Sequence, residues 1–349
     1  MYKSLIVPLD GSALAEQALA TASAFAKKSG AKLHLMRVHN PYPRNTYGGP
    51  LMAPTDARWD RNVRRRETKY LSGLAASTKE ALRRSVPASL KDGPVVEAIC
   101  AFARTVPAPL LIMSTHGAGG LNRRWMGSTA DRVIRVAPCP ILLVRPLAEQ
   151  GRRGAPTFPQ RLLVPLDGSP EAEAIVDWVF EFGVAAPLEI VLAEVITPGP
   201  HSPLYWLAAS EFGKREMDDL EHEELEYAKA SLDEVAMRIR QALPGTVVQT
   251  DVRLSDHPAT GILEAAAEHG ADLLAMTTHG RGASRLVLGS VIDKVLRGSS
   301  AAMLVVRPEP RAAAKQNAAG GPKRRFAGRS SVRPSSGRRP ASRRRSPAP

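Results

Sequence analysis

The sequence predicts an α/β protein built from two tandem copies of an open, doubly wound, five-stranded parallel sheet. Three observations lead to this prediction. The segment LIVPLDGS at residues 5–12 recurs as LLVPLDGS at residues 162–169. Apolar runs of strand type alternate with helical patterns in both copies, which is typical of parallel sheets with crossover helices. Runs such as LLIM at residues 110–113 are apolar at every position, as expected of strands covered on both faces.

The elements follow in order along each copy. Right-handed crossovers between parallel strands place the helices on both faces of the sheet. Ser169 followed by Pro170 favours a helix start, because serine caps a helix and proline fits its first turn. In the first copy, strand patterns lie near 3–8, 32–39, 86–91, 109–114 and 140–145, and helical patterns near 13–29, 57–84, 94–105 and 128–136. In the second copy, strand patterns lie near 160–165, 187–196, 246–254, 272–277 and 301–306, and helical patterns near 170–183, 210–242, 259–269 and 290–297.

The formal charge of +14 is distributed unevenly. Residues 309–349 hold twelve Lys and Arg and one acidic residue, a surplus of +11, which leaves +3 for the first 308 residues. This tail has too little apolar material to offset the entropy of ordering, so we expect disorder. It can bind nucleic acid or another acidic partner without sequence preference, or act as a solubilising tail alone. We expect domains at 1–147 and 160–308, a linker at 148–159 and this tail.

The expected compartment is the cytoplasm. We expect no leader peptide at Met1, and no apolar run approaches the roughly 18 residues of a membrane span. Cys100 and Cys139 share no spacing motif, so we expect two buried, reduced thiols.

The second helical pattern of each copy carries opposite charge. Residues 56–85 hold nine basic and four acidic residues, whereas residues 211–243 hold five basic and ten acidic ones. Two solvated helix faces explain this pattern. The alternative is attraction between the two faces, within the chain or across a dimer.

Polar residues and glycines follow the strands at the same expected edge of each sheet. Asp10 and Asp167 end the first strand of each copy, where a carboxylate can bind a ribose or base, or a metal through water; the structural alternative is an Asx turn. Glycines that end the fourth strand and open the last helix leave room for an anion, namely Gly117, Gly127, Gly280 and Gly289.

Ser128 and Ser290 follow these helix-opening glycines and can donate hydroxyls to phosphate oxygens. Their alternative is a capping box with Asp131 and Asp293. Loop arginines can neutralise phosphates or remain solvated: Arg123, Arg124, Arg281 and Arg285.

Catalytic motifs are not recognisable. His116 and His279 invite a catalytic role, but neither has a nucleophile motif or a second metal ligand at suitable spacing. The Walker lysine motif and the Rossmann glycine fingerprint are also missing from the sequence. We therefore expect a binding protein rather than an enzyme, with slow nucleotide hydrolysis as the least favoured alternative.

These motifs together resemble the universal stress protein family in its tandem two-domain form. The resemblance rests on VPLDGS at 7–12, MSTHG at 113–117, Gly127-Ser128 and PCPILLV at 138–144, with their counterparts in the second copy. It implies the strand order 3-2-1-4-5 of the adenine nucleotide α-hydrolase-like fold, pairing of domains through their last strands, and ATP as cofactor, alone or with Mg²⁺.

ATP-binding members of that family carry Gly, two residues, Gly, nine residues, Gly and then Ser or Thr. The first copy matches with Gly117, Gly127 and Ser128; the second matches with Gly280, Gly289 and Ser290, across eight residues. Ser114 and Thr277 replace the first glycine. The resemblance places adenine and ribose contacts on Pro8, Asp10, Val38, Pro165, Asp167 and Val195.

Two functional hypotheses follow. The first is a dimeric stress-response protein that binds adenine nucleotide in one or both domains and acts as a sensing module. The second is a nucleotide-independent interaction scaffold, whose basic tail binds nucleic acid or acidic partners.

Overall fold

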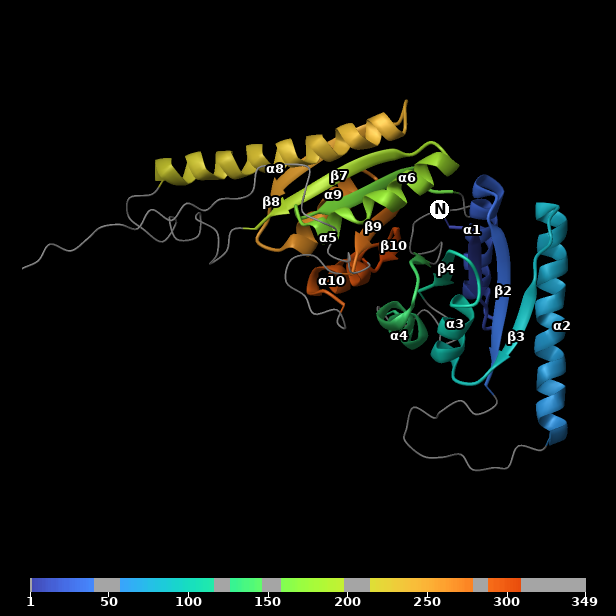
Figure 1. Ribbon diagram of the computed structural model, residues 1–349. Coiled ribbons are helices and arrows are strands. Elements are labelled where there is room, and N and C mark those ends of the chain that lie inside the picture. Colours follow the sequence, from blue (N-terminus) through green and yellow to red (C-terminus); the bar gives the residue numbers. More distant parts are fainter. Residues whose placement is uncertain are drawn as a thin grey trace, which may run out of the picture. The chain divides into compact units, whose positions relative to one another are not determined.

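The computed structural model describes residues 2–40, 57–115, 126–145, 158–197, 214–278 and 288–308, with the side chains of 214–220 excepted (Figure 1). The first half contains β1 (Ser4–Pro8), α1 (Ala13–Ser29), β2 (Lys32–His39), α2 (Ala57–Leu82), β3 (Ala88–Asp92), α3 (Val95–Ala103), β4 (Pro109–Ser114), α4 (Ser128–Val136) and β5 (Ile141–Val144). The second half contains β6 (Arg161–Leu166), α5 (Pro170–Glu173), α6 (Val176–Ala185), β7 (Glu189–Ile196), α8 (Lys214–Ala242), β8 (Val248–Leu254), α9 (Pro258–Glu268), β9 (Leu273–Thr277), α10 (Ser290–Gly298) and β10 (Ala302–Val306).

The strands form one ten-stranded sheet in the order β3-β2-β1-β4-β5-β10-β9-β6-β7-β8. Each half therefore has the order 3-2-1-4-5, and all strand pairs within a half are parallel. The halves join through their last strands, because β5 and β10 pair antiparallel with Leu142 opposite Leu304. The expected fold class, strand order and pairing through the last strands are confirmed.

Both faces of the sheet are covered by hydrophobic side chains. Leu5 and Val7 point into one buried cluster, whereas Ile6 between them points into the other. Because successive side chains of a strand point to opposite faces, a strand between two helix layers must be apolar throughout. The first cluster contains residues from α1, α6 and α8, and the second contains residues from α3, α4, α9 and α10.

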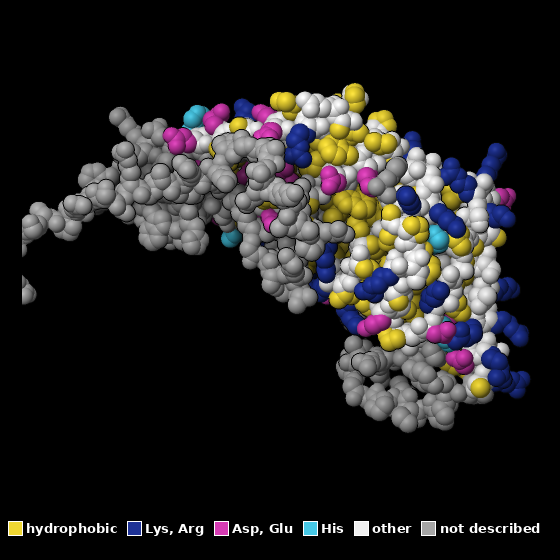
Figure 2. Space-filling model, viewed as in Figure 1, with side chains coloured by type: hydrophobic (Ala, Val, Ile, Leu, Met, Phe, Trp, Pro, Cys, Tyr) yellow, Lys and Arg dark blue, Asp and Glu magenta, His cyan; other side chains and the backbone are white. Residues whose placement is uncertain are grey.

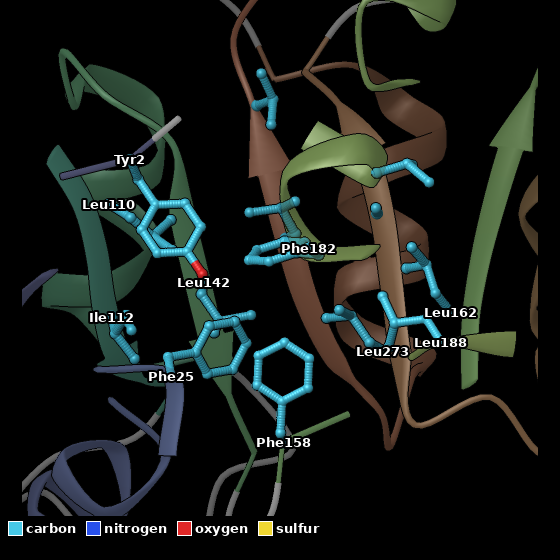
Figure 3. Close-up of a cluster of buried hydrophobic side chains, with 14 of the residues drawn as sticks. Tyr2, Phe25, Leu110, Ile112, Leu142, Phe158, Leu162, Phe182, Leu188 and Leu273 are labelled. Atoms are coloured by element: carbon cyan, nitrogen blue, oxygen red, sulfur yellow. The ribbon is translucent and has the colours of Figure 1, made fainter. Parts of the chain in front are cut away.

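An aromatic cluster links the two halves on the first of these faces (Figure 3). The ring of Phe25 lies 4.4 Å from that of Phe158 and 5.3 Å from that of Phe182, measured between centroids. Tyr2 stacks on Trp178 at 6.2 Å, and its backbone N–H donates to Glu181 Oε2 at 2.9 Å. Aromatic residues make up only 5% of the sequence, yet several of them gather at this junction.

The helical pattern at 170–183 differs from expectation, because it forms two helices. The backbone N–H of Ile175 bonds to the carbonyl of Ala172, and that of Trp178 bonds to the carbonyl of Ile175. These bonds span three residues rather than four, so a tighter turn separates α5 from α6. Ile175 is fully buried at this turn.

The predicted tail at 309–349 lies outside the described residues, so its disorder stays a prediction. Within the described ranges, no helix combines the length and apolarity needed to cross a membrane.

Candidate functional site

The last helix of each half begins against the tip of the fourth strand. The Gly127 N–H donates to the carbonyl of Thr115 at 2.7 Å, and the Gly289 N–H donates to that of Thr278 at 3.1 Å. A Cβ on Gly289 would lie only 3.1 Å from the Thr278 oxygen. This close approach of two backbone segments favours glycine at position 289. The predicted role of Gly289 beside a bound anion stays a prediction.

In the second half these elements line an open cavity of about 280 Å³. Its wall joins residues that are far apart in the sequence, from β6, β7, β9, α9 and the start of α10. Five expected site residues line it: Pro165, Asp167, Val195, Gly289 and Ser290. Further lining residues include Pro258, Ile262, Met276, Thr277 and Thr278. Gly280, the sixth expected residue of this half, lies outside the described residues.

The wall formed by α9 was not found from the sequence. Pro258 opens α9 and Ile262 lies one turn later, and both line the cavity. Gly261 lets the helix approach β7, because a Cβ there would lie 2.8 Å from Val195 Cγ1. The glycine inside the apolar helical pattern was the available signal, since such a glycine often marks close packing.

Asp167 has a structural role at the cavity wall. Its Oδ1 accepts the backbone N–H of Ser169 at 3.0 Å and the Ser169 hydroxyl at 2.6 Å. The Ser169 Oγ in turn accepts the N–H of Ala172 and caps α5. The Asx-turn alternative is therefore correct for Oδ1. Contact of this carboxylate with a ligand stays a prediction.

The capping-box alternative for the two serines is wrong. Ser128 and Ser290 are the first helical residues, and the caps are Gly127 and Gly289, without a side-chain hydrogen bond. Asp131 and Asp293 instead pair with arginines one turn further on, Arg135 at 3.0 Å and Arg297 at 2.9 Å. The pKa of the Asp293 carboxyl is lowered, mainly by its hydrogen bond from Arg297. Each serine is exposed at its helix N-terminus.

The first half repeats the strand and helix positions with different polar side chains. Asp10 Oδ1 accepts the N–H of Ser12 at 2.9 Å and its hydroxyl at 2.6 Å, as Asp167 does with Ser169. Arg37 Nη1 lies 2.9 Å from the Cβ position of Gly11, which has a left-handed φ of 86°. The guanidinium of Arg37 therefore lies over the turn that follows Asp10.

The register of the strands identifies the counterpart of Arg37. Pro8 lies opposite Met36, and Pro165 lies opposite Ala193, so Arg37 and Glu194 occupy equivalent positions. The first half thus has a cation, and the second half an anion, at the same position of the sheet edge.

The other expected residues of the first half lie where the sequence placed them. Pro8 ends β1, Val38 lies near the end of β2, and Gly127 and Ser128 open α4. Gly117 lies outside the described residues, as do His116, His279 and the four loop arginines.

A polar network behind the first-half strand tips was also missed. Arg37 Nε donates to Glu67 Oε1 at 3.0 Å, and His39 Nδ1 lies 2.6 Å from Glu67 Oε2. His39 Nε2 lies 2.9 Å from Asp60 Oδ1, and the imidazole is buried. Burial lowers the pKa of His39, but the two hydrogen-bonded carboxylates outweigh it and raise that pKa overall. Both ring nitrogens lie beside carboxylate oxygens, which accept hydrogen bonds, so the arrangement favours the protonated imidazole between β2 and α2.

Among the described residues, no group of three His, Cys, Asp or Glu side chains has a geometry able to hold a metal ion.

Comparison with known proteins gives the same architecture. A universal stress protein from Mycolicibacterium smegmatis is 24% identical over 308 residues, covering 87% of this chain and 97% of its own. A universal stress protein from Thermus aquaticus is 32% identical over 145 residues, 42% of this chain and all of its own. The crystal structure of a universal stress protein from Archaeoglobus fulgidus superposes with a TM-score of 0.58 at 17% identity, over 88% of this chain and 99% of its own.

The match to the family itself covers both halves, over residues 1–145 and 159–307. Strand order, tandem arrangement and sequence match agree, and the chain belongs to the universal stress protein family.

Proposed function

We propose that the second half binds an adenine nucleotide, ATP, in the cavity between its strand tips and α10. The protein then acts as a sensing module of the stress response, without fast turnover. The single observation that carries the proposal is the cavity of about 280 Å³ lined by Asp167, Val195 and the first residues of α10. This volume lies near the lower end of the roughly 300–1,000 Å³ that is usual for small-molecule pockets.

The residues that line the cavity suit the phosphates, the ribose and the adenine of a nucleotide. The first N–H groups of a helix lack intrahelical partners and carry a partial positive charge, so the start of α10 favours phosphate. The exposed Ser290 hydroxyl lies at that point. Asp167 is assigned to the ribose, and Pro165 and Val195 to the adenine. Mg²⁺, where present, enters with the phosphates.

The first half is proposed as the second nucleotide site. Pro8, Asp10 and Val38 supply the adenosine contacts there, and Gly127 with Ser128 supplies the phosphate end. Arg37 beside the Asp10 turn gives this site a positive group that the second half replaces with Glu194. The two sites therefore differ in affinity for the same nucleotide.

Equilibrium dialysis of the full chain against ATP, with and without Mg²⁺, tests the proposal. Asp167→Ala removes the ribose contact and should lower uptake, but it also removes the acceptor that holds Ser169, the cap of α5. Asp167→Asn is the sharper variant, because an amide oxygen still accepts the Ser169 bonds while the carboxylate is lost. Asp10→Asn is the matched change in the first half. No ATP uptake by the wild-type protein rejects the proposal.

The other assignments are proposals of the same kind. We propose domains at 1–147 and 160–308, a linker at 148–159, a tail at 309–349, a cytoplasmic location, and a homo-oligomeric state, namely a dimer. We infer no enzymatic activity.

A nucleotide-independent scaffold is the second candidate function, and the composition of the tail favours it. Residues 309–349 hold twelve Lys and Arg and one acidic residue. Deletion of 309–349 separates the candidates. If the deleted protein loses nucleic-acid binding but takes up ATP as before, the tail is the nucleic-acid-binding segment. If the full chain binds nucleic acid but takes up no ATP, the scaffold function replaces the first proposal.

A further inference from the structure

The two homologous halves have opposite net charge. Residues 1–147 hold 22 Lys and Arg against nine Asp and Glu, whereas residues 160–308 hold 12 against 23. The near neutrality of the first 308 residues thus arises from one basic and one acidic half. The largest contrast lies in the equivalent long helices α2 and α8.

The cations of α2 form a row on its outer face. Six exposed cations lie on a single side of the helix, because they are three or four residues apart or separated by whole turns. They are Arg58, Arg61, Arg65, Lys69, Lys79 and Arg83, of which Arg83 lies just beyond the helix end. Figure 2 shows dark blue Lys and Arg side chains along this part of the molecule. At about 1.5 Å per residue the row is roughly 37 Å long.

The acids of α2 mostly lie on its other sides. Asp60 and Glu67 face β2, where they bond to His39, and Glu80 is the one exposed acid in the described part of the helix. Within the described residues, Arg61, Arg65 and Lys69 form no ion pair. Arg64, on a different side of the helix, pairs with Asp92. Arg61, Arg65 and Lys69 therefore form a basic surface that the described part of the chain does not neutralise.

The exposed face of α8 has the opposite character. Glu223, Glu226 and Glu234 are exposed on one side, and none forms an ion pair within the described residues. Two of the cations on α8 are engaged elsewhere: Arg238 pairs with Glu173 at 2.8 Å, and Arg240 donates to the carbonyl of Val248 at 2.6 Å. Tyr227 and Met237 add apolar surface, with 39% and 57% of each exposed.

The two surfaces cannot meet within one chain. α2 packs on β2 and β3 at one end of the strand order, and α8 packs on β7 and β8 at the other. Nine strand spacings of about 4.8 Å separate the edge strands by on the order of 40 Å. This exceeds the Debye length of about 8 Å at physiological salt several-fold, so attraction between these helices within the chain is excluded.

We propose that the basic face of α2 docks on the acidic face of α8 of a second copy of this chain. Both faces belong to helices of similar length, 26 and 29 residues, and every copy offers one of each. The contact is heterologous, so it closes into a ring or a reciprocal pair, or it extends into a chain. This proposal is independent of nucleotide binding.

Nucleic acid is the competing occupant of the basic face. A row of arginines also matches a phosphate backbone, but the acidic half of the same chain repels a polyanion. The acidic face of α8 has no explanation in a nucleic-acid complex, whereas a second copy accounts for both faces. Exposed ion pairs are individually weak and screened by salt, so the assembly should dissociate as salt rises.

A charge-swap experiment on the full chain tests the proposal. One triple variant, Arg61→Glu, Arg65→Glu and Lys69→Glu, makes both faces acidic; a second, Glu223→Lys, Glu226→Lys and Glu234→Lys, makes both faces basic. Sedimentation velocity of nuclease-treated protein at about 0.02 M and about 0.5 M salt measures association. The wild-type protein should associate at low salt only. Each variant alone should associate about tenfold more weakly, and an equimolar mixture should recover association.

The matched control reverses three exposed cations outside α2, Lys27→Glu, Lys28→Glu and Arg104→Glu. It changes the net charge equally and should keep the association, whereas its loss would assign the effect to net charge and overturn the proposal. A wild-type protein that stays monomeric at low salt also overturns it, as does a mixture without recovery. If the protein does not self-associate but binds a short DNA duplex through the α2 row, the partner of the basic face is a polyanion and not a second copy of the chain.

Discussion

The backbone N–H of Gly289 donates a 3.1 Å hydrogen bond to the carbonyl of Thr278, and a Cβ on that glycine would lie 3.1 Å from the same oxygen. This contact holds the start of α10 against the tip of β9. Both residues line the second-half cavity, so the position of the helix N-terminus and the shape of the cavity depend on one close approach.

Gly289→Ala should therefore weaken ATP binding and lower the free energy of unfolding by about 1–3 kcal/mol, because the added methyl group pushes the helix from the strand. Chemical denaturation and equilibrium dialysis measure the two effects. Gly73→Ala is the matched control: a Cβ there meets nothing within 4 Å, and alanine favours the helix by up to about 1 kcal/mol. If the two variants have the same free energy of unfolding and the same ATP binding, the contact between Gly289 and Thr278 does not hold α10 in place.

The hydrogen bonds of the buried His39 imidazole with Asp60 and Glu67 should make the stability of the protein depend on pH. Burial lowers the pKa of His39, but the bonded carboxylates of Asp60 and Glu67 raise it above its usual value of about 6.5. A folded-state pKa above the unfolded one gives stability that is fully present below about pH 6.5 and is lost as pH rises through the folded pKa. The free energy of unfolding should thus decrease from pH 6 toward alkaline pH.

Urea denaturation across that range measures the effect, and NMR titration of the imidazole reports the pKa directly. Asp60→Asn removes one of the two carboxylates and should reduce the pH dependence. A profile in the wild-type protein that rises with pH over this window, with His39 titrating below its usual pKa, would show that the imidazole is not held as a cation.

A core substitution at the junction of the two halves should strongly lower the free energy of unfolding. Leu304 in β10 lies opposite Leu142 in β5, and both are fully buried. Leu304→Ala should lower the free energy of unfolding by about 2–5 kcal/mol, because it leaves a cavity in a packed core. Val136→Ala, at a residue that is 51% exposed, should change it by less than about 0.5 kcal/mol. Thermal and chemical denaturation of both variants check this contrast.

The sequence contained most of the fold because the relevant signals are local. Runs such as Leu110–Met113 are apolar on both faces, and the duplicated PLDGS segment gives the period of the repeat. The element bounds agree with the expected ones within a few residues, apart from the turn at Ile175. Nothing in the sequence near that turn marks a helix end, since neither glycine nor proline is present there.

The site was predictable only in part, because side-chain partners depend on tertiary packing. The Asp167 position and the glycine at the start of α10 follow from the sequence alone. The His39 network does not, since Asp60 and Glu67 come from a helix 21 and 28 residues further along the chain. The same holds for Arg37 above Gly11 and for Ile262 in the cavity wall, which α9 brings to β7.

The two cysteines should be inert in the folded protein. Burial raises the pKa of the Cys139 thiol to about 12, and it also raises that of Cys100. The thiolate is the reactive form, so neither thiol should react with a disulfide reagent at pH 8 within minutes. Both should react fully in denaturant, which provides the control. A chromogenic disulfide assay follows the reaction, and rapid modification of either thiol under native conditions would show that the second core cluster opens at α3 or at the loop before β5.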